Sequence, residues 1–159
     1  MLVLSVQKGK IAIKAIERDM HLGGQDFDNK LLNDCIKKFN TKYKVDMSKS
    51  RKALRRLHSE CERAKKSLSS WEETVINIDY LYKGHDFSIK VTRTMFEKLN
   101  ANLFEKCMEI MRRCLSDAHL KHDQIDDIVL VGGFIACKKV ARFAETRFWI
   151  GKAMQHSRP

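Results

Sequence analysis

Long apolar runs are missing from this sequence. None approaches the ~20 consecutive apolar residues that a membrane-spanning helix needs. The opening stretch, residues 1–8, is too short for a secretory core and has no basic leader. Without a signal or a span, the default location is the cytoplasm. Hydrophobic residues fill 43% of the 159 positions and charged residues 32%, which is typical of soluble globular proteins rather than disordered ones.

Metal-binding spacings are also missing. The five cysteines include no Cys-x-x-Cys pair, and the six histidines are scattered, so the sequence predicts no zinc or other metal site. Four of the cysteines fall on or beside predicted apolar helix faces: Cys35, Cys61, Cys107 and Cys114. This placement predicts buried free thiols in a reducing compartment.

Acidic residues are in the minority. The chain has 31 Lys and Arg against 20 Asp and Glu, a formal net charge of +11. This excess favours contact with nucleic acid or with acidic surfaces. However, the basic residues alternate with acidic ones over most of the chain, and stacking aromatics are not interleaved with them. A specific nucleic-acid function is therefore disfavoured.

Alternating apolar residues predict two β-hairpins. The first pairs residues 2–6 with 11–15 around a turn at Gly9, and the second pairs 74–79 with 86–91 around a turn at Gly84. The two hairpins do not belong to one obvious sheet. A continuous apolar run at residues 127–131 predicts a strand buried on both faces.

Apolar residues at spacings of three and four predict the helices. These run from residue 25 to about 42, from 48 to 70, from about 94 to 119 with Asn100 as a candidate break, and from 134 to 149. Ser48 or Ser50 can cap the second helix. Thr92 or Thr94 can cap the third, and Thr94 with Glu97 fits a capping box.

The last turns of helix 48–70 carry an unusual polar cluster. Glu62, Lys65, Lys66 and Ser69 recur at i, i+3, i+4 and i+7, which predicts that they share one polar edge. A carboxylate, two ammonium groups and a hydroxyl on one edge can bind a ligand that carries hydroxyls or a planar polar ring. The alternative is a solvated face with intrahelical ion pairs such as Glu62 to Lys66.

Five collinear motifs together resemble the heat-shock protein 70 family of ATP-driven chaperones. They are His21-Leu22-Gly23-Gly24-Gln25-Asp26-Phe27-Asp28-Asn29, Leu54-Arg55-Arg56-Leu57, residues 61–70, residues 78–87 and Ile128-Val129-Leu130-Val131-Gly132-Gly133. The resemblance implies an α/β, actin-like ATPase (ribonuclease H-like) fold, of which this chain matches lobe II only. Its sheet would be incomplete and would carry an inserted α+β subdomain.

The resemblance also implies a division of the chain. Residues 23–100 would form the outer subdomain of lobe II, and residues 1–22 and 101–150 would form its partial base. Residues 151–159 would be an irregular tail. The family binds adenine and ribose between these two subdomains. Carried over by position, the nucleotide contacts are Gly24, Glu62, Lys65, Lys66, Ser69, Gly132 and Gly133.

Several departures from the family pattern fall in this site. Phe134 and Ala136 stand where the family has serine and an arginine that stacks on adenine, and Lys66 stands where it usually has arginine. An ammonium cannot reproduce the planar stacking face of a guanidinium. The resemblance therefore implies a degraded half-site for ATP or ADP, with affinity that is weak or lost, and no metal.

Phosphoryl transfer needs cations and donors positioned around the γ-phosphate. The family's phosphate loops, catalytic lysine and metal-coordinating carboxylates have no counterparts in this sequence. We therefore expect a chain that is not an enzyme and does not hydrolyse ATP by itself.

Other interpretations stay open. Residues 23–100, with Leu81, Tyr82, Phe87 and the basic helix 48–70, could be an interaction module that binds nucleotide-exchange co-chaperones. The chain could also be a decayed product that folds poorly, because an uncovered apolar sheet favours aggregation. The sequence does not determine the oligomeric state.

Overall fold

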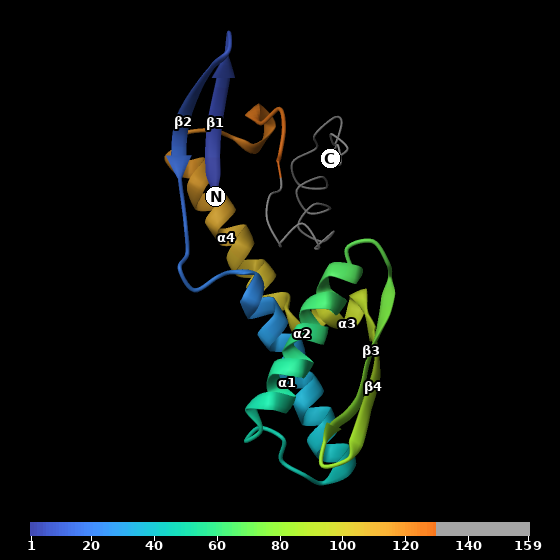
Figure 1. The fold of residues 1–159 in the computed structure, drawn as a ribbon. Coiled ribbons are helices and arrows are strands. Elements are labelled where there is room, and N and C mark those ends of the chain that lie inside the picture. The colour runs from blue at the N-terminus through green and yellow to red at the C-terminus, as the bar shows by residue number, and fades with distance from the viewer. Residues whose placement is uncertain (130–159) are drawn as a thin grey trace. The chain divides into compact units, whose positions relative to one another are not determined.

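The computed structural model describes residues 1–129, which form two compact units (Figure 1). One unit contains residues 1–22 and 102–129, and the other contains residues 23–101. Within residues 1–129, no helix combines the length and apolar character required to cross a membrane. The predicted helix 134–149 and the tail 151–159 lie outside the described residues.

The first unit is built on the predicted hairpin, which is confirmed. Strands β1 (Leu2–Gln7) and β2 (Lys10–Ile16) are antiparallel. Lys8 and Gly9 join them with φ of 48° and 77°, the backbone that a two-residue hairpin turn requires. One face of the hairpin packs on helix α4 (Ala101–Asp117). The buried cluster consists of Val3, Met108, Met111, Cys114 and Leu115.

The second unit contains helices α1 (Gly24–Tyr43) and α2 (Arg51–Ser67). Helix α2 is shorter than the predicted span of 48–70. It begins after Ser50, whose Oγ accepts a hydrogen bond of 3.3 Å from the Ala53 amide. Beyond Ser67 the backbone changes to turns, with hydrogen bonds from the Ser69 amide to the Lys66 carbonyl and from the Ser70 amide to the Ser67 carbonyl. The Arg93 guanidinium donates to the carbonyls of Leu68 (3.0 Å) and Trp71 (2.7 Å), which lie just beyond the last helical turn.

The predicted second hairpin is also confirmed and is longer than expected. Strands β3 (Glu73–Tyr82) and β4 (His85–Thr92) are antiparallel, and α1, α2 and α3 lie on one side of them (Figure 1). Phe39 of α1 packs edge-on against Phe87 of β4, with ring centroids 5.8 Å apart. Aromatic packing of this kind joins the helices to the sheet.

Asn100 separates α3 (Arg93–Leu99) from α4, as its position predicted. The Asn100 side chain is fully buried, and its Nδ2 donates to the Phe96 carbonyl at 2.9 Å. The capping box at Thr94 is wrong: the cap is Thr92, whose Oγ1 accepts from the Met95 amide at 3.2 Å. A short 3₁₀ turn, η1 (His122–Gln124), follows α4.

The predicted strand 127–131 is not seen in its described part. Residues 127–129 have no regular structure, and Val129 is 80% exposed rather than buried. A strand is stabilised by pairing its backbone donors and acceptors with a neighbour. The described strands form two separate two-stranded sheets, β1–β2 and β3–β4, and neither pairs with these residues. The separation of the two hairpins agrees with the sequence prediction.

Candidate functional site

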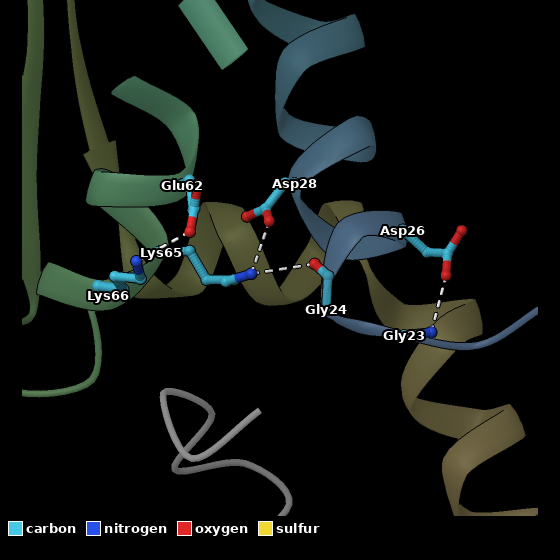
Figure 2. Close-up of polar contacts among 7 residues, drawn as sticks. All are labelled: Gly23, Gly24, Asp26, Asp28, Glu62, Lys65 and Lys66. Atoms are coloured by element: carbon cyan, nitrogen blue, oxygen red, sulfur yellow. Dashed lines mark hydrogen bonds and ion pairs between the residues drawn. The ribbon is translucent and has the colours of Figure 1, made fainter. Parts of the chain in front are cut away.

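Lys65 is not part of a solvated face, which was the alternative interpretation of the polar edge. Its side chain is 9% exposed and turns from α2 toward the first turn of α1 (Figure 2). Its Nζ lies 2.6 Å from Asp28 Oδ2 and 3.0 Å from the Gly24 carbonyl oxygen. The Asp28 side chain is 3% exposed. A charge this deeply buried needs a partner, and Asp28 supplies it.

Gly24 is the first residue of α1, and a side chain there would crowd Lys65. A Cβ built on Gly24 would lie 3.3 Å from Lys65 Nζ, closer than ordinary van der Waals contact. Glycine at this position therefore allows the ammonium to approach the backbone and bind the Gly24 carbonyl. The preceding Gly23 amide is also satisfied, because it donates to Asp26 Oδ2 at 2.7 Å.

Glu62 and Lys66 form the exposed part of the cluster. Glu62 Oε1 and Lys66 Nζ are 2.8 Å apart, one helical turn from each other on α2 (Figure 2). The hydrogen bond and the charge of Lys66 lower the pKa of Glu62. The hydrogen bond that Lys66 donates to Glu62, and the charge of that carboxylate, raise the pKa of Lys66. Both groups are therefore charged at neutral pH. The predicted intrahelical ion pair is confirmed.

Ser69 lies just beyond the end of α2. Its Oγ donates to the Lys66 carbonyl oxygen at 2.5 Å. This bond uses the hydroxyl proton and leaves the lone pairs of the oxygen as acceptors. The hydroxyl can therefore accept a bond from a ligand, but it cannot donate one in this arrangement.

The structure brings the predicted residues together as two adjacent groups. Gly24 and Lys65 meet at the start of α1, and Glu62 pairs with Lys66 on α2 (Figure 2). Two predicted contacts lie outside the described residues: Gly132 and Gly133. The same holds for the departures from the family pattern at Phe134 and Ala136.

Asp28 is the residue of this cluster that the sequence reasoning missed. It shares a helix face with Leu31 and Cys35, three and seven residues later, and that face is buried. An acidic residue on a buried apolar helix face needs a basic partner from another element. The position of Asp28 on that face was the feature of the sequence that could have identified it.

Two thiols meet between the same helices. Cys35 of α1 and Cys61 of α2 are both fully buried. Contact with the Cys35 thiol and burial raise the pKa of Cys61 far above its usual range. The predicted buried free thiols are confirmed for Cys35, Cys61 and Cys114, while Cys107 is half-buried. Within residues 1–129, no three His, Cys, Asp or Glu side chains are grouped so that they could hold a metal ion.

Comparison with known proteins finds a consistent set of relatives. The family model described as Hsp70 protein matches residues 1–153. A heat shock protein of Pyricularia oryzae is 42% identical over 155 residues, which cover 98% of this chain and 25% of that protein. Heat shock 70 kDa protein of Emericella nidulans is 43% identical over 146 residues, covering 92% and 23%. Heat shock 70 kDa protein II of Paracentrotus lividus is 40% identical over 155 residues, covering 98% and 41%.

These matches overturn the expectation that the chain is not an enzyme. That expectation assumed that the family's phosphate loops, catalytic lysine and metal-coordinating carboxylates are absent from the protein because this sequence does not contain them. The relatives are ATPases, and the chain spans about a quarter of the length of the first two. The ends of this sequence therefore give no ground for denying the activity.

The family match covers nearly the whole chain, and the two small α/β units are compatible with the nucleotide-binding region, which has the actin-like ATPase fold. The identities of 40–43% extend over at least 92% of the chain. This chain belongs to the Hsp70 protein family.

Proposed function

We propose that this chain forms one wall of an adenine-nucleotide site in lobe II of an Hsp70 nucleotide-binding domain. Residues 23–100 would be the outer subdomain, and residues 1–22 and 101–150 would be the base. The observation that carries the proposal is the pair of adjacent groups on α2, with Lys65 bound at Gly24 and Glu62 paired to Lys66. These are the positions at which the family resemblance puts nucleotide contacts.

The chemistry of the cluster suits a ligand with hydroxyls and ring nitrogens. The Glu62 carboxylate accepts hydrogen bonds, the Lys66 ammonium donates them, and the Ser69 oxygen accepts them. Glu62 and Lys66 are about half exposed, so a ligand can reach them from solvent. With Ala136 in place of the stacking arginine, the site has lost one planar contact, and we propose a low affinity for ADP and ATP.

A thermal melt of the full 159-residue chain with and without ADP tests this proposal. A ligand that binds only the folded state stabilises it by mass action, about 2.7 kcal/mol at 100 times Kd. We expect the melting temperature to rise with ADP. We also expect the rise to shrink in Glu62→Gln and Lys66→Met.

Lys38→Met is the matched control for this experiment. Lys38 forms an exposed i,i+4 pair with Asp34 on α1, at 2.8 Å, but lies outside the cluster. It should leave the ADP response unchanged. A cooperative melt that ADP does not move in the unaltered chain would contradict the proposal.

A second candidate function is the docking of a nucleotide-exchange co-chaperone on residues 23–100. The observation that favours it is the exposure of large side chains on and just before strand β3: Trp71 is 69% exposed, Val75 60% and Tyr80 75%. Of the residues expected to make this contact, Leu81 and Phe87 are buried in the core, so they support the surface rather than form it. Binding of an acidic exchange factor that is lost in Tyr80→Lys and kept in Lys38→Met would favour this function.

The cytoplasmic location stays a prediction from the sequence.

A further inference from the structure

We infer that Asp28 is a positioning residue for this site: it holds Lys65 against Gly24, and so holds the start of α1 to the last turns of α2 in one arrangement. The inference rests on the proposed nucleotide site. In the proposed arrangement Asp28 does not contact the ligand. It fixes the position of Lys65, which does.

Asp28 is buried and is bound through one of its two oxygens. Its side chain is only 3% exposed, and its Oδ2 receives the Lys65 ammonium at 2.6 Å. Its other oxygen, Oδ1, is buried and has no hydrogen-bond partner among the described residues. Lys65 is therefore the group that balances the charge of this carboxylate, and the two side chains cannot separate without leaving a buried charge unpaired.

The pairing with Asp28 also fixes the orientation of the Lys65 ammonium. An ammonium has three protons to donate. One is directed at Asp28 Oδ2 and one at the Gly24 carbonyl oxygen, at 2.6 and 3.0 Å. Two fixed bonds determine the direction of the third N–H. In the proposed arrangement this third N–H, on a side chain that stays 9% exposed, meets the ligand already oriented, which lowers the entropy lost on binding.

A positioning role and a purely structural role for Asp28 predict different effects on ADP affinity. If the Asp28–Lys65 pair only holds α1 against α2, weakening the pair lowers the stability of the fold. The affinity of the folded protein for ADP then stays unchanged. If Asp28 positions Lys65, affinity falls even under conditions where the variant is fully folded. The dissociation constant for ADP, measured well below the melting temperature, is the readout that a structural role would not move.

The experiment compares Asp28→Asn with Asp34→Asn in the full chain by calorimetric titration with ADP. Both changes remove one carboxylate charge from α1 at nearly constant volume. Asp34 is paired to Lys38 on the same helix, its side chain is 23% exposed, and it lies outside the cluster. Hydrogen bonds to charged groups are the strong ones, so we expect ADP binding to weaken about tenfold or more in Asp28→Asn. Asp34→Asn should match the unaltered chain. We also expect faster backbone amide hydrogen exchange over residues 28–31 in Asp28→Asn, but not in Asp34→Asn.

A double variant keeps the test decisive if Asp28→Asn does not fold. Replacing a buried ion pair by apolar side chains of similar volume often preserves stability, so Asp28→Leu with Lys65→Met should fold. We expect it to melt cooperatively and to bind ADP no more weakly than Lys65→Met alone, because Asp28 acts only through Lys65. ADP affinity equal to that of the unaltered chain, in either variant, would overturn the inference while leaving the nucleotide site in place. Absence of ADP binding by the unaltered chain would instead overturn the proposed function.

Discussion

Two neighbouring lysines of α2 show how strongly a residue depends on its surroundings. Lys65 is buried against Asp28, and Lys66 pairs with Glu62 in solvent. Burial makes the first pair interdependent, because a charge without its partner in the interior is costly. Solvent screens the second pair, so its members are nearly independent of each other for stability.

Replacing each lysine by methionine tests this contrast. Lys65→Met leaves the Asp28 carboxylate buried without its cation, and we expect the free energy of unfolding to fall by about 3 kcal/mol. Lys66→Met removes an exposed pair and should leave the urea midpoint nearly unchanged. Urea unfolding followed by circular dichroism measures both. Equal losses in the two variants would contradict the difference in burial on which the prediction depends.

Cys107 differs from the other described thiols in being half-buried. Burial raises the pKa of Cys107 from its ordinary 9.0 to about 11. We therefore expect alkylation by iodoacetamide to be slow at about pH 8 and to accelerate as pH approaches 11, because the thiolate is the reacting form. Since the folded state holds this proton more tightly than the unfolded chain, the associated stabilisation is present below pH 9 and is lost between pH 9 and 11.

Mass spectrometry of alkylated peptides at successive pH values measures this order. Cys107 should be modified before Cys35, Cys61 and Cys114, which are buried. Modification of any of those three ahead of Cys107 in the folded chain would be inconsistent with their burial.

At the scale of elements, local chemistry predicted where most helices and strands begin. Ser50 and Thr92 are N-caps because a short hydroxyl side chain satisfies a free amide in the first turn. Gly9 and Gly84, both with φ of 77°, mark the hairpin turns. The end of α2 was not predictable in the same way, since the carbonyls beyond it are satisfied by Arg93, more than twenty residues later.

The cap of α2 provides a test at this scale. Ser50→Ala removes the hydroxyl that accepts from the Ala53 amide, and we expect a loss of about 1 kcal/mol in stability. Ser48→Ala is the control, because Ser48 Oγ donates to Asp46 outside the helix rather than to the helix backbone. Thermal denaturation of the two variants distinguishes them. A larger loss of stability in Ser48→Ala than in Ser50→Ala would contradict the assignment of Ser50 as the cap of α2.

At the scale of the whole molecule, one face of the β1–β2 hairpin is apolar and exposed. Cross-strand partners share a face, and the pairs Leu2–Ile16, Leu4–Ile13 and Val6–Ile11 all consist of large aliphatic residues. Each of these six side chains is 46–69% exposed. An apolar strand surface of this kind favours self-association.

We therefore expect the chain to associate with increasing concentration. Val6→Lys combined with Ile11→Glu places an opposite-charge pair on this face and should reduce association. Gln7→Glu places a carboxylate opposite Lys10, at the exposed turn end of the other face, and should have a smaller effect. Size-exclusion chromatography with light scattering measures the mass. A monomer at all concentrations in the unaltered chain would show that this face does not drive association.

The sequence by itself determined the two hairpins, most helix starts, the break at Asn100 and the Hsp70 family. These depend on periodicity, turn residues and caps, which act within a few positions of the chain. Only the tertiary structure decided that Lys65 turns inward to Asp28, that α2 ends at Ser67, and that residues 127–129 are not a strand. Each of these depends on a partner from a distant element, and spacing along one helix or strand carries no information about such a partner.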